Sequence, residues 1–587
     1  MIRTSMSRGR ALGSFSAAMG LFLAGAVVTT TGSAQSAEPA GDCTEPYPVA
    51  DIVSALDADQ AVPVTTKSVV RGTDPIEFTG EVLGVIDDGI AFDVDMIMVK
   101  VTPQSPDEIG GIWQGMSGSP VYAADDRLIG AIAYGLSYGP SWIAGVTPFE
   151  DMDDYLAAPA ARKVAVGAST ARTIANSSEV TTDQAESGFT RLPMPTGVSG
   201  VDADRVAQIR SSDTHAWLPK RTFAMGSPSA AASAPGPDTI FAGGNLAASL
   251  SYGDVTQAGI GTATSVCDGR VVGFGHPMMF LGETTLTMHP ATAIYVQPES
   301  LGAPFKVANL GQPAGTITDD HRTGITGAFG ALPDTTDITS TVAYDGETRT
   351  GSSHVTVKQA TAATTFYELV GNHDKVVDGQ IPGSELLSWT INGHQADGST
   401  FSLVVTDRYA SDFDITFDSA FELADFVWSL SAIPGVTIDE VGTNSQVVDD
   451  HATFNVTGFE QRRAGTWVKV LRGEPVFARA GKTLTLRAVL TSATGTTTVP
   501  VAVAIPANAS GGMARLNVTG GGSVWSRATY PRSVAQAVRY VQTLVRNDQL
   551  QVELEMMTRR AVIQKRSTTA PVDKVVYGHK AVQLLVR

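Results

Sequence analysis

The sequence predicts a mainly β protein, and three features of its 587 residues indicate this class. Short apolar runs recur between Gly and Asp turns, as in residues 64–101. Other stretches alternate apolar and polar residues with the period of a strand, as in residues 483–489. Glycine is plentiful, with 59 residues, and it favours turns over long helices. We therefore expect many short strands and few helices.

The elements are assigned in chain order from these patterns. Strands are expected in two similar blocks, and the Ala-, Ser-, Thr- and Pro-rich stretch between them is expected to be an irregular connection. Helices are predicted over 419–431, which begins with a Ser419/Glu422 capping box, and over 533–546, which has valines on one face. The predicted regions are 64–157 and 238–335 (strands), 158–237 (connection), 336–435 (α+β), 436–525 (β-sandwich) and 526–587 (helix plus strands).

Length and composition limit the classes of function that the protein can have. The chain is long enough for about three to four domains, and its 43% hydrophobic and 17% charged residues indicate a folded core. Its net charge of −18 excludes a generic binder of nucleic acid or anionic membrane, because both partners attract basic surfaces. The two cysteines are too few for a disulfide-rich scaffold, a zinc ribbon or a four-cysteine iron–sulfur site.

Residues 1–37 have the order of a secretory signal. Three arginines precede an apolar run at about 15–28, and small residues follow at 29–37. Cleavage after Ala34 or Ala37 would remove three arginines and no acid, which changes the net charge from −18 to −21. An N-terminal anchor is the alternative.

The expected product is secreted or lies in the cell envelope, without a membrane span once the signal is removed. No later segment has the roughly 20 consecutive apolar residues of a membrane helix. Cys43 and Cys267 both follow the signal and would meet an oxidising compartment. A Cys43–Cys267 disulfide is therefore expected, with two unpaired thiols as the alternative.

The stretch from Gly115 to Pro120 is the most informative candidate for chemistry, because it places Ser117 between glycines. Small neighbours let a substrate carbonyl approach a serine nucleophile. The backbone N–H groups of Gly115 and Ser117 could then form an oxyanion hole. A plain hairpin loop is the alternative. The stretch resembles the Gly-x-Ser-Gly-[Gly/Ser]-Pro signature around the nucleophile of chymotrypsin-like peptidases.

A general base has to come from downstream, because all nine histidines follow Ser117. His276 is the candidate: an apolar strand precedes it, and Gly275 leaves space around the imidazole. His289 precedes a proline in a similar way but lacks the glycine. Asp95 opens an apolar strand that resembles the strand whose aspartate orients the histidine of chymotrypsin-like enzymes. A surface aspartate is the alternative for Asp95.

Three stretches together resemble the SpoIVB peptidase family, serine peptidases related to the chymotrypsin-like group. Gly110-Gly111-Ile112-Trp113-Gln114-Gly115-Met116-Ser117-Gly118-Ser119-Pro120 is similar to the segment that carries that family's serine. Ala258–Gly275-His276 is similar to its histidine segment, and Gly315–Gly327 to its Gly-Thr-Ile…Gly-Ile-x-Gly segment. The resemblance covers about 64–335 and implies two β-barrel halves that meet at a cleft.

The chain departs from that family in two ways. Its serine segment precedes its histidine segment, which implies that the two half-barrels are swapped in chain order. The position that matches the family's catalytic aspartate is Thr102. Asp95 is the choice for the acid, and Asp107 and Asp320 are the alternatives.

We therefore expect an exported serine endopeptidase that acts on a protein or peptide substrate, with Ser117, His276 and Asp95 as its triad. No cofactor or metal is expected, since the adjacent side chains of Asp319-Asp320-His321 point in different directions. Hydrolysis should rise with pH through roughly 6 to 7.5, as a histidine base loses its proton. The rival is a catalytically inactive binding or scaffold protein of the cell envelope on a peptidase fold.

Overall fold

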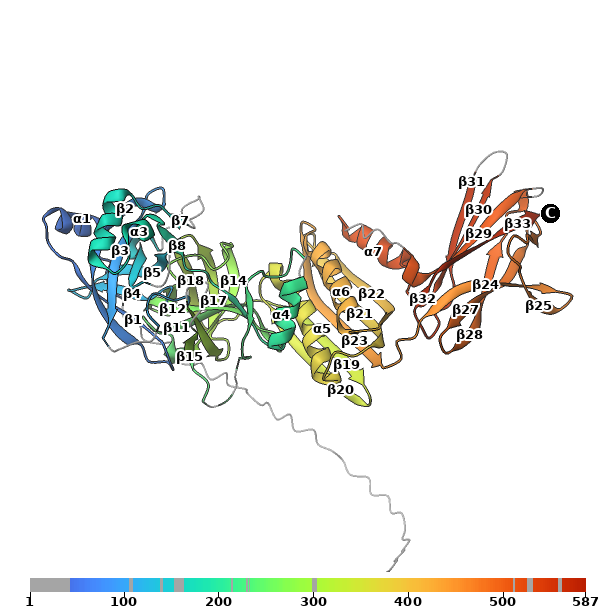
Figure 1. The fold of residues 1–587 in the computed structure, drawn as a ribbon, viewed down its shortest axis with the longest axis horizontal. Helices are drawn as coiled ribbons and strands as arrows, with labels where there is room; N and C mark the ends of the chain where they lie inside the picture. Colours follow the sequence, from blue (N-terminus) through green and yellow to red (C-terminus); the bar gives the residue numbers. More distant parts are fainter. Residues whose placement is uncertain are drawn as a thin grey trace, which may run out of the picture. The chain divides into compact units, whose positions relative to one another are not determined.

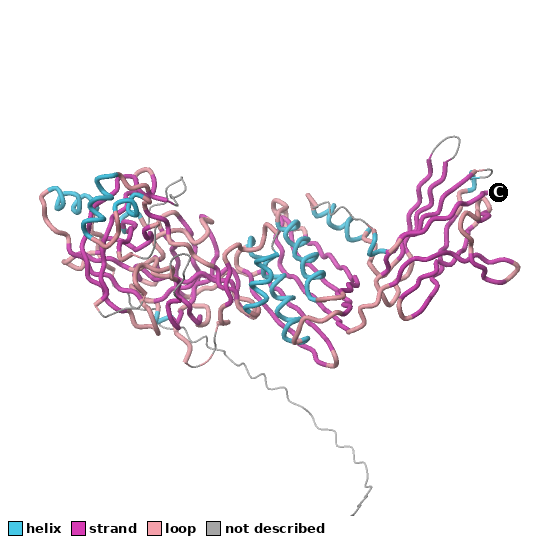
Figure 2. Tube along the Cα trace, in the orientation of Figure 1, coloured by secondary structure: helices cyan, strands magenta, loops and turns pink. Residues whose placement is uncertain are grey.

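The structure is a computed structural model of the 587 residues. The chain divides into Met1–Ala37 and Glu38–Arg587, and the predicted signal lies outside the described residues. The described residues are 43–587 except 105–108, 138–140, 153–162, 213–214, 229–230, 232, 298–303, 510–511, 525–530 and 558–561. Strands make up 49% and helices 18%, so the predicted mainly β class is confirmed (Figure 2).

The first barrel closes six antiparallel strands, in the order β4-β1-β2-β3-β6-β5, through a β4–β5 pairing. Alternating burial along β1 and near-complete burial of β5 place apolar side chains inside it. Helix α1 (Val49–Asp57) precedes the barrel. The strands are β1 (Pro63–Ser68), β2 (Ile76–Ala91), β3 (Val94–Pro103), β4 (Pro120–Ala123), β5 (Leu128–Leu136) and β6 (Ile143–Pro148).

The second barrel also closes six strands, in the order β12-β13-β18-β17-β14-β11, through a β12–β11 pairing. The hairpin of β15 (Ala291–Gln297) and β16 (Phe305–Leu310) lies between β14 and β17 in the chain. The two closed barrels confirm the fold class that the sequence predicts. The barrel strands are β11 (Asn245–Gly253), β12 (Gln257–Cys267), β13 (Arg270–Gly273), β14 (Gly282–His289), β17 (Gly315–His321) and β18 (Gly324–Phe329).

The stretch between the barrels contains more structure than the sequence predicts. Strand β8 pairs with β5 of the first barrel and β9 pairs with β12 of the second, so the connection extends both sheets. Its strands have only two or three residues each, which is too short for a clear period. The elements of this stretch are β7 (Lys163–Val164), α2 (Ala168–Ser177), α3 (Thr182–Glu186), β8 (Phe189–Arg191), β9 (Thr196–Val198), α4 (Ala203–Ser212) and β10 (Thr222–Ala224).

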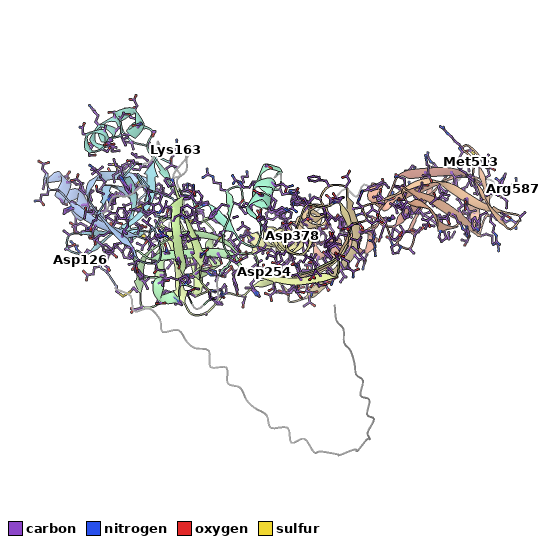
Figure 3. The ribbon with its side chains drawn as sticks, turned by 60° about the horizontal axis from the view of Figure 1, so that its bottom comes forward. Asp126, Lys163, Asp254, Asp378, Met513 and Arg587 are labelled. Carbon is purple, nitrogen blue, oxygen red and sulfur yellow. A yellow bond between two sulfur atoms is a disulfide. The ribbon has the colours of Figure 1, made fainter. Side chains whose placement is uncertain are left out.

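An α+β region follows, with strand order β20-β19-β23-β21-β22 and helices α5 and α6 packed together on the sheet (Figure 1). Strand β20 pairs with β11, which makes the sheet continuous with that of the second barrel. Asp254, which is labelled in Figure 3, lies in the turn after β11 and forms a 2.9 Å ion pair with Arg349 of β20. The elements are β19 (Thr336–Tyr344), β20 (Glu347–Val355), α5 (Thr361–Val377), β21 (Gly383–Gln395), β22 (Thr400–Ser411), α6 (Thr416–Ser431) and β23 (Val436–Val448).

Two five-stranded sheets near the C-terminus share one apolar core and form a β-sandwich. It begins after β23, which belongs to the preceding sheet, and includes the last strands of the chain. Helix α7 (Val534–Thr543) precedes β30. The strands are β24 (Phe454–Arg463), β25 (Thr466–Lys469), β26 (Val476–Ala478), β27 (Thr483–Ser492), β28 (Gly495–Ala504), β29 (Met513–Gly520), β30 (Leu550–Met557), β31 (Val562–Thr568), β32 (Val576–Tyr577) and β33 (His579–Val586).

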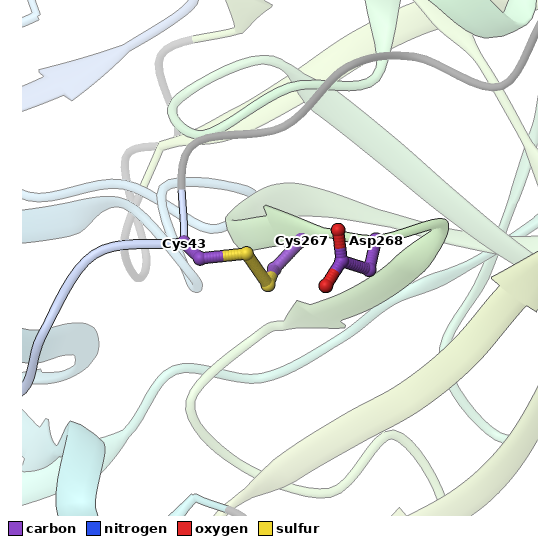
Figure 4. A group of neighbouring side chains, drawn as sticks. All are labelled: Cys43, Cys267 and Asp268. Carbon is purple, nitrogen blue, oxygen red and sulfur yellow. A yellow bond between two sulfur atoms is a disulfide. The ribbon is translucent and has the colours of Figure 1, made fainter.

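A disulfide joins Cys43, before the first barrel, to Cys267 at the end of β12 (Figure 4). Their Cα atoms lie 4.8 Å apart, so the expected pairing forms. Among the described helices, none combines the length and apolarity needed to cross a bilayer.

Candidate functional site

The serine turn, residues 115–119, lies just before β4 and takes its shape from two glycines. Gly115 and Gly118 have φ angles of +97° and +96°, which strain any residue with a Cβ atom. A Cβ on Gly118 would lie 1.9 Å from the carbonyl oxygen of Thr262, which rules out other residues without movement of the backbone. The glycines around Ser117 are therefore required by the turn itself.

Strand β12 of the second barrel holds this turn of the first barrel. Thr262 N–H donates to the Ser117 carbonyl at 2.8 Å, and the Thr262 hydroxyl donates to the Gly115 carbonyl at 3.1 Å. The Thr264 hydroxyl donates to the Gly118 carbonyl at 2.8 Å. The two threonines thus fix three carbonyls of the turn and place Ser117 at the junction of the barrels.

Ser117 and His276 are hydrogen bonded, as the sequence predicts. The distance from Ser117 Oγ to His276 Nε2 is 2.8 Å, and neither residue has exposed surface. The other ring nitrogen, Nδ1, lies 2.8 Å from the carbonyl oxygen of Pro277. Because a carbonyl can only accept, this contact places the proton on Nδ1 and leaves Nε2 to accept from the serine hydroxyl. The tautomer is the one that a general base needs.

The expectation that Asp95 orients His276 is wrong. Asp95 lies on β3, and its carboxylate accepts the backbone N–H of Asp88 at 2.9 Å across the β2–β3 hairpin. The Nδ1 that the aspartate was expected to face is bonded to Pro277 instead. An aspartate that opens an apolar strand serves equally well to brace a turn, which is its role here. Asp107 lies outside the described residues.

Asp320, the other alternative, braces the loop after His276. It is buried on β17, and its carboxylate accepts backbone N–H groups from Met278 at 2.7 Å, Met279 at 2.8 Å and Leu281 at 3.1 Å. Burial raises the pKa of the Asp320 carboxyl, and the backbone hydrogen bonds oppose that rise. Asp320 is therefore a positioning residue for the histidine loop.

The surroundings keep His276 neutral. Burial lowers the pKa of the imidazole to about 4, which outweighs the opposing hydrogen bond to Pro277. The positive charge of Arg191 adds to the lowering of this pKa. The side chain is thus an unprotonated base at neutral pH.

The backbone N–H groups of the turn differ in whether they are already hydrogen bonded. Met116 N–H donates to the Trp113 carbonyl at 3.1 Å, and Ser119 N–H donates to the Met116 carbonyl at 2.9 Å. Within the part of the chain that the structure describes, the N–H groups of Gly115 and Ser117 have no acceptor. These are the two groups predicted for an oxyanion hole, and they are available for one.

A second serine–histidine pair lies in the second barrel. Ser249 Oγ is 2.9 Å from His289 Nε2, and His289 Nδ1 is 3.0 Å from the Gly311 carbonyl. Ser249 sits inside β11, paired with β12 and β14, so its backbone cannot form a turn around an oxyanion. The sequence indicated His289 as a candidate base but not Ser249, because no glycine turn or other motif marks a serine inside an apolar strand. This pair shows that a Ser–His hydrogen bond alone does not define a nucleophile.

The described residues contain one cluster with the composition of a metal site. The ligand atoms of Cys43, Cys267 and Asp268 lie within 4.8 Å of one another (Figure 4). Both sulfurs belong to the disulfide, so neither is a thiolate that could bind a metal. The cluster is explained by the disulfide.

In comparisons with known proteins, no family model, curated protein or solved structure matches this chain. The fold and the site define a two-barrel β protein with a buried serine–histidine pair where the barrels meet.

Proposed function

We propose that the protein is an exported serine endopeptidase, similar in its motifs to the SpoIVB peptidase family. The observation that carries the proposal is the 2.8 Å hydrogen bond from Ser117 to a neutral His276, made on a turn with two available N–H donors. Ser249 has a comparable histidine but lacks such a turn. The combination at Ser117 is the set of groups that acyl transfer requires.

The reaction then follows from the geometry. His276 Nε2 takes the hydroxyl proton as Ser117 Oγ attacks the peptide carbonyl, and the N–H groups of Gly115 and Ser117 stabilise the oxyanion. The imidazolium gives its proton to the leaving amine as the C–N bond breaks, which leaves an acyl-serine. Water attacks this ester while His276 takes one of its protons. Collapse releases the carboxylic acid and returns the proton to Ser117.

The Pro277 carbonyl performs part of the task of a triad aspartate. It fixes the Nδ1–H tautomer and the ring orientation at 2.8 Å. A carbonyl dipole stabilises the imidazolium less than a full negative charge would, so we expect a slower enzyme than a complete triad gives.

The burial of both side chains favours one rival function. Ser117 and His276 have no exposed surface, so a peptide reaches Oγ only after the site opens. A protein that never opens would be an inactive binding or scaffold protein on a peptidase fold. The two functions differ in whether Ser117 reacts with an external electrophile.

The test is labelling by a fluorophosphonate probe, which forms a covalent bond with an activated serine. We expect the wild type to be labelled, and Ser117→Ala and His276→Ala to lose labelling. Ser249→Ala is the matched control, because it removes the serine of the other buried pair, and it should label like the wild type. A folded wild type that is not labelled would reject the peptidase in favour of the rival.

A further inference from the structure

A cavity of about 650 Å³ is lined by residues of both barrels and of the connection between them. It is lined from the first barrel by Ile112 and Gln114, from the end of β8 by Arg191, and from β10 and β16 by Phe223 and Phe305. Two further arginines, Arg210 and Arg221, also line it. We call it the arginine cleft, defined by Arg191, Arg210 and Arg221.

Three arginines line the cleft of a protein that is acidic as a whole. No Asp or Glu is among the described residues that line the cleft, although the whole chain carries a net charge of −18. Arg210 is held by a hydrogen bond from Nη1 to the Thr222 carbonyl at 3.2 Å. Guanidinium groups bind carboxylates through paired N–H donors. The guanidinium groups of the cleft therefore suit an anionic group.

The lining of the cleft includes Gln114, which directly precedes the serine turn in the chain. Gln114 precedes Ser117 by three residues, and its backbone is fixed by bonds to Pro304 at 2.7 Å and Lys306 at 2.9 Å. Arg191 acts electrostatically on His276, whose pKa it helps to lower. A peptide in the cleft would therefore pass the residue that leads into the serine turn.

Apolar side chains form one part of the remaining lining. The rings of Phe223 and Phe305 have centroids 5.5 Å apart, and Ile112 and Leu192 lie on the same cavity. Such a surface accommodates an aliphatic or aromatic side chain. The cleft thus offers arginines for a carboxylate and, beside them, a place for an apolar group.

We propose that the arginine cleft binds a carboxylate of the peptide substrate next to an apolar side chain, and so directs cleavage to acidic peptides. The carboxylate comes either from an Asp or Glu side chain or from a free C-terminus. This inference rests on the proposed function, because it assigns the specificity of the same site.

The experiment compares kcat/KM for matched peptides. One pair differs by Glu against Gln beside a Phe residue, and a second pair differs by a free against an amidated C-terminus. We expect the wild type to prefer the carboxylate in one pair by about tenfold, as expected for a charge-assisted hydrogen bond. The pair that shows the preference identifies the source of the carboxylate. Raising the salt concentration should reduce the preference by screening.

Variants locate the effect. Arg210→Gln combined with Arg221→Gln should reduce the preference to about twofold or less. Arg172→Gln is the charge control, because Arg172 is exposed on α2 and does not line the cleft. It should keep the wild-type preference. No preference in either pair, or a preference that survives the double variant, would overturn the inference.

Binding measurements separate this inference from the proposed function. Ser117→Ala protein is mixed with the same fluorescent peptides, and binding is followed by polarisation. Tighter binding of the carboxylate peptide, lost in the arginine variants, supports the cleft even if fluorophosphonate does not label the wild type. Labelling without any carboxylate preference in binding or cleavage leaves the peptidase standing and rejects the cleft.

Discussion

At His276, a backbone carbonyl stands where an aspartate was expected. The Pro277 carbonyl lies 2.8 Å from Nδ1, and it belongs to the residue that follows the histidine in the chain. The contact depends on the local fold of the loop, and any residue in that position has the same carbonyl. A backbone partner of this kind leaves no pattern in the side chains, which is why the sequence suggested Asp95 instead.

The first prediction concerns the aspartate. Asp95→Asn should leave kcat/KM within about twofold of the wild type, because Asn Oδ1 can still accept the Asp88 N–H and no carboxylate faces His276. Ser117→Ala should lower kcat by about 10³-fold or more. Steady-state hydrolysis of one peptide by the three proteins measures both. A loss of activity in Asp95→Asn comparable to that in Ser117→Ala would show that Asp95 takes part in catalysis after all.

The second prediction concerns pH. A histidine base works only when neutral, and burial lowers the pKa of His276 to about 4. Because the shift is downward, the neutral form persists below pH 6.5, and kcat/KM should fall only as the pH falls through about 4. This corrects the rise through 6 to 7.5 that an unperturbed histidine gives. A pH profile of kcat/KM for a small ester from pH 3 to 8 decides between these two midpoints. A midpoint near 6.5 would show that His276 titrates like an exposed histidine.

At the scale of elements, the serine turn depends on its fit against β12. The third prediction is that Gly118→Ala abolishes fluorophosphonate labelling, because its Cβ would meet the Thr262 carbonyl at 1.9 Å and displace Ser117. Gly110→Ala is the matched control: Gly110 also has a positive φ, of +76°, but a Cβ there meets nothing within 4 Å. It should cost only about 1 kcal/mol of stability and keep labelling. Equal labelling of both variants would contradict the docking of the turn.

The histidine loop depends on Asp320 in a similar way. The fourth prediction is that Asp320→Asn slows labelling of Ser117, because one amide oxygen cannot replace two carboxylate oxygens that accept three N–H groups. Each buried donor left unpaired costs about 1–3 kcal/mol. The control is Asp319→Asn, next to it. The Asp319 carboxylate contacts the Thr318 hydroxyl and His321, and it bonds no described residue of the loop. Labelling rates are compared well below the unfolding temperature, and equal rates would show that the loop holds without Asp320.

Prediction of elements succeeded where the local period was clear. Helix α7 begins at Val534 with Ser533 as its cap, close to the predicted 533–546. Helix α6 begins at Thr416, so Ser419 lies within the helix and the expected capping box does not form. Helix α5 was missed because nearly all of its side chains are buried, which removes the polar face that reveals a helix. The start of α6 and the presence of α5 therefore depend on tertiary packing, which local sequence patterns do not record.

At the scale of the whole molecule, segments far apart in the chain meet at Ser117. The serine turn comes from one barrel, and β12 and the histidine loop come from the other. Sequence patterns identified these segments, since each has glycines or apolar strands of its own. Their contacts are hydrogen bonds between residues more than a hundred positions apart, which no local pattern records. The sequence therefore identifies the segments that form the site but does not show how they contact one another.

The last prediction concerns the disulfide, which closes a sequence separation of 224 residues and spans the first barrel and the first two strands of the next. Replacing Cys43 and Cys267 by serine should lower the free energy of unfolding by about 2–5 kcal/mol, because the unfolded chain regains freedom that the cross-link removes. Labelling of Ser117 should persist below the lowered midpoint, since Thr262 and Thr264, which hold the turn, do not need the sulfurs.

Thermal unfolding with and without a reductant gives the control. The reductant should shift the midpoint of the wild type toward that of the double serine variant and should not shift the variant itself, because the variant has no disulfide to lose. Identical midpoints for the oxidised wild type, the reduced wild type and the variant would mean that the cross-link does not constrain the barrels. Loss of labelling in a folded variant would instead place the N-terminal segment before the first barrel among the supports of the serine turn.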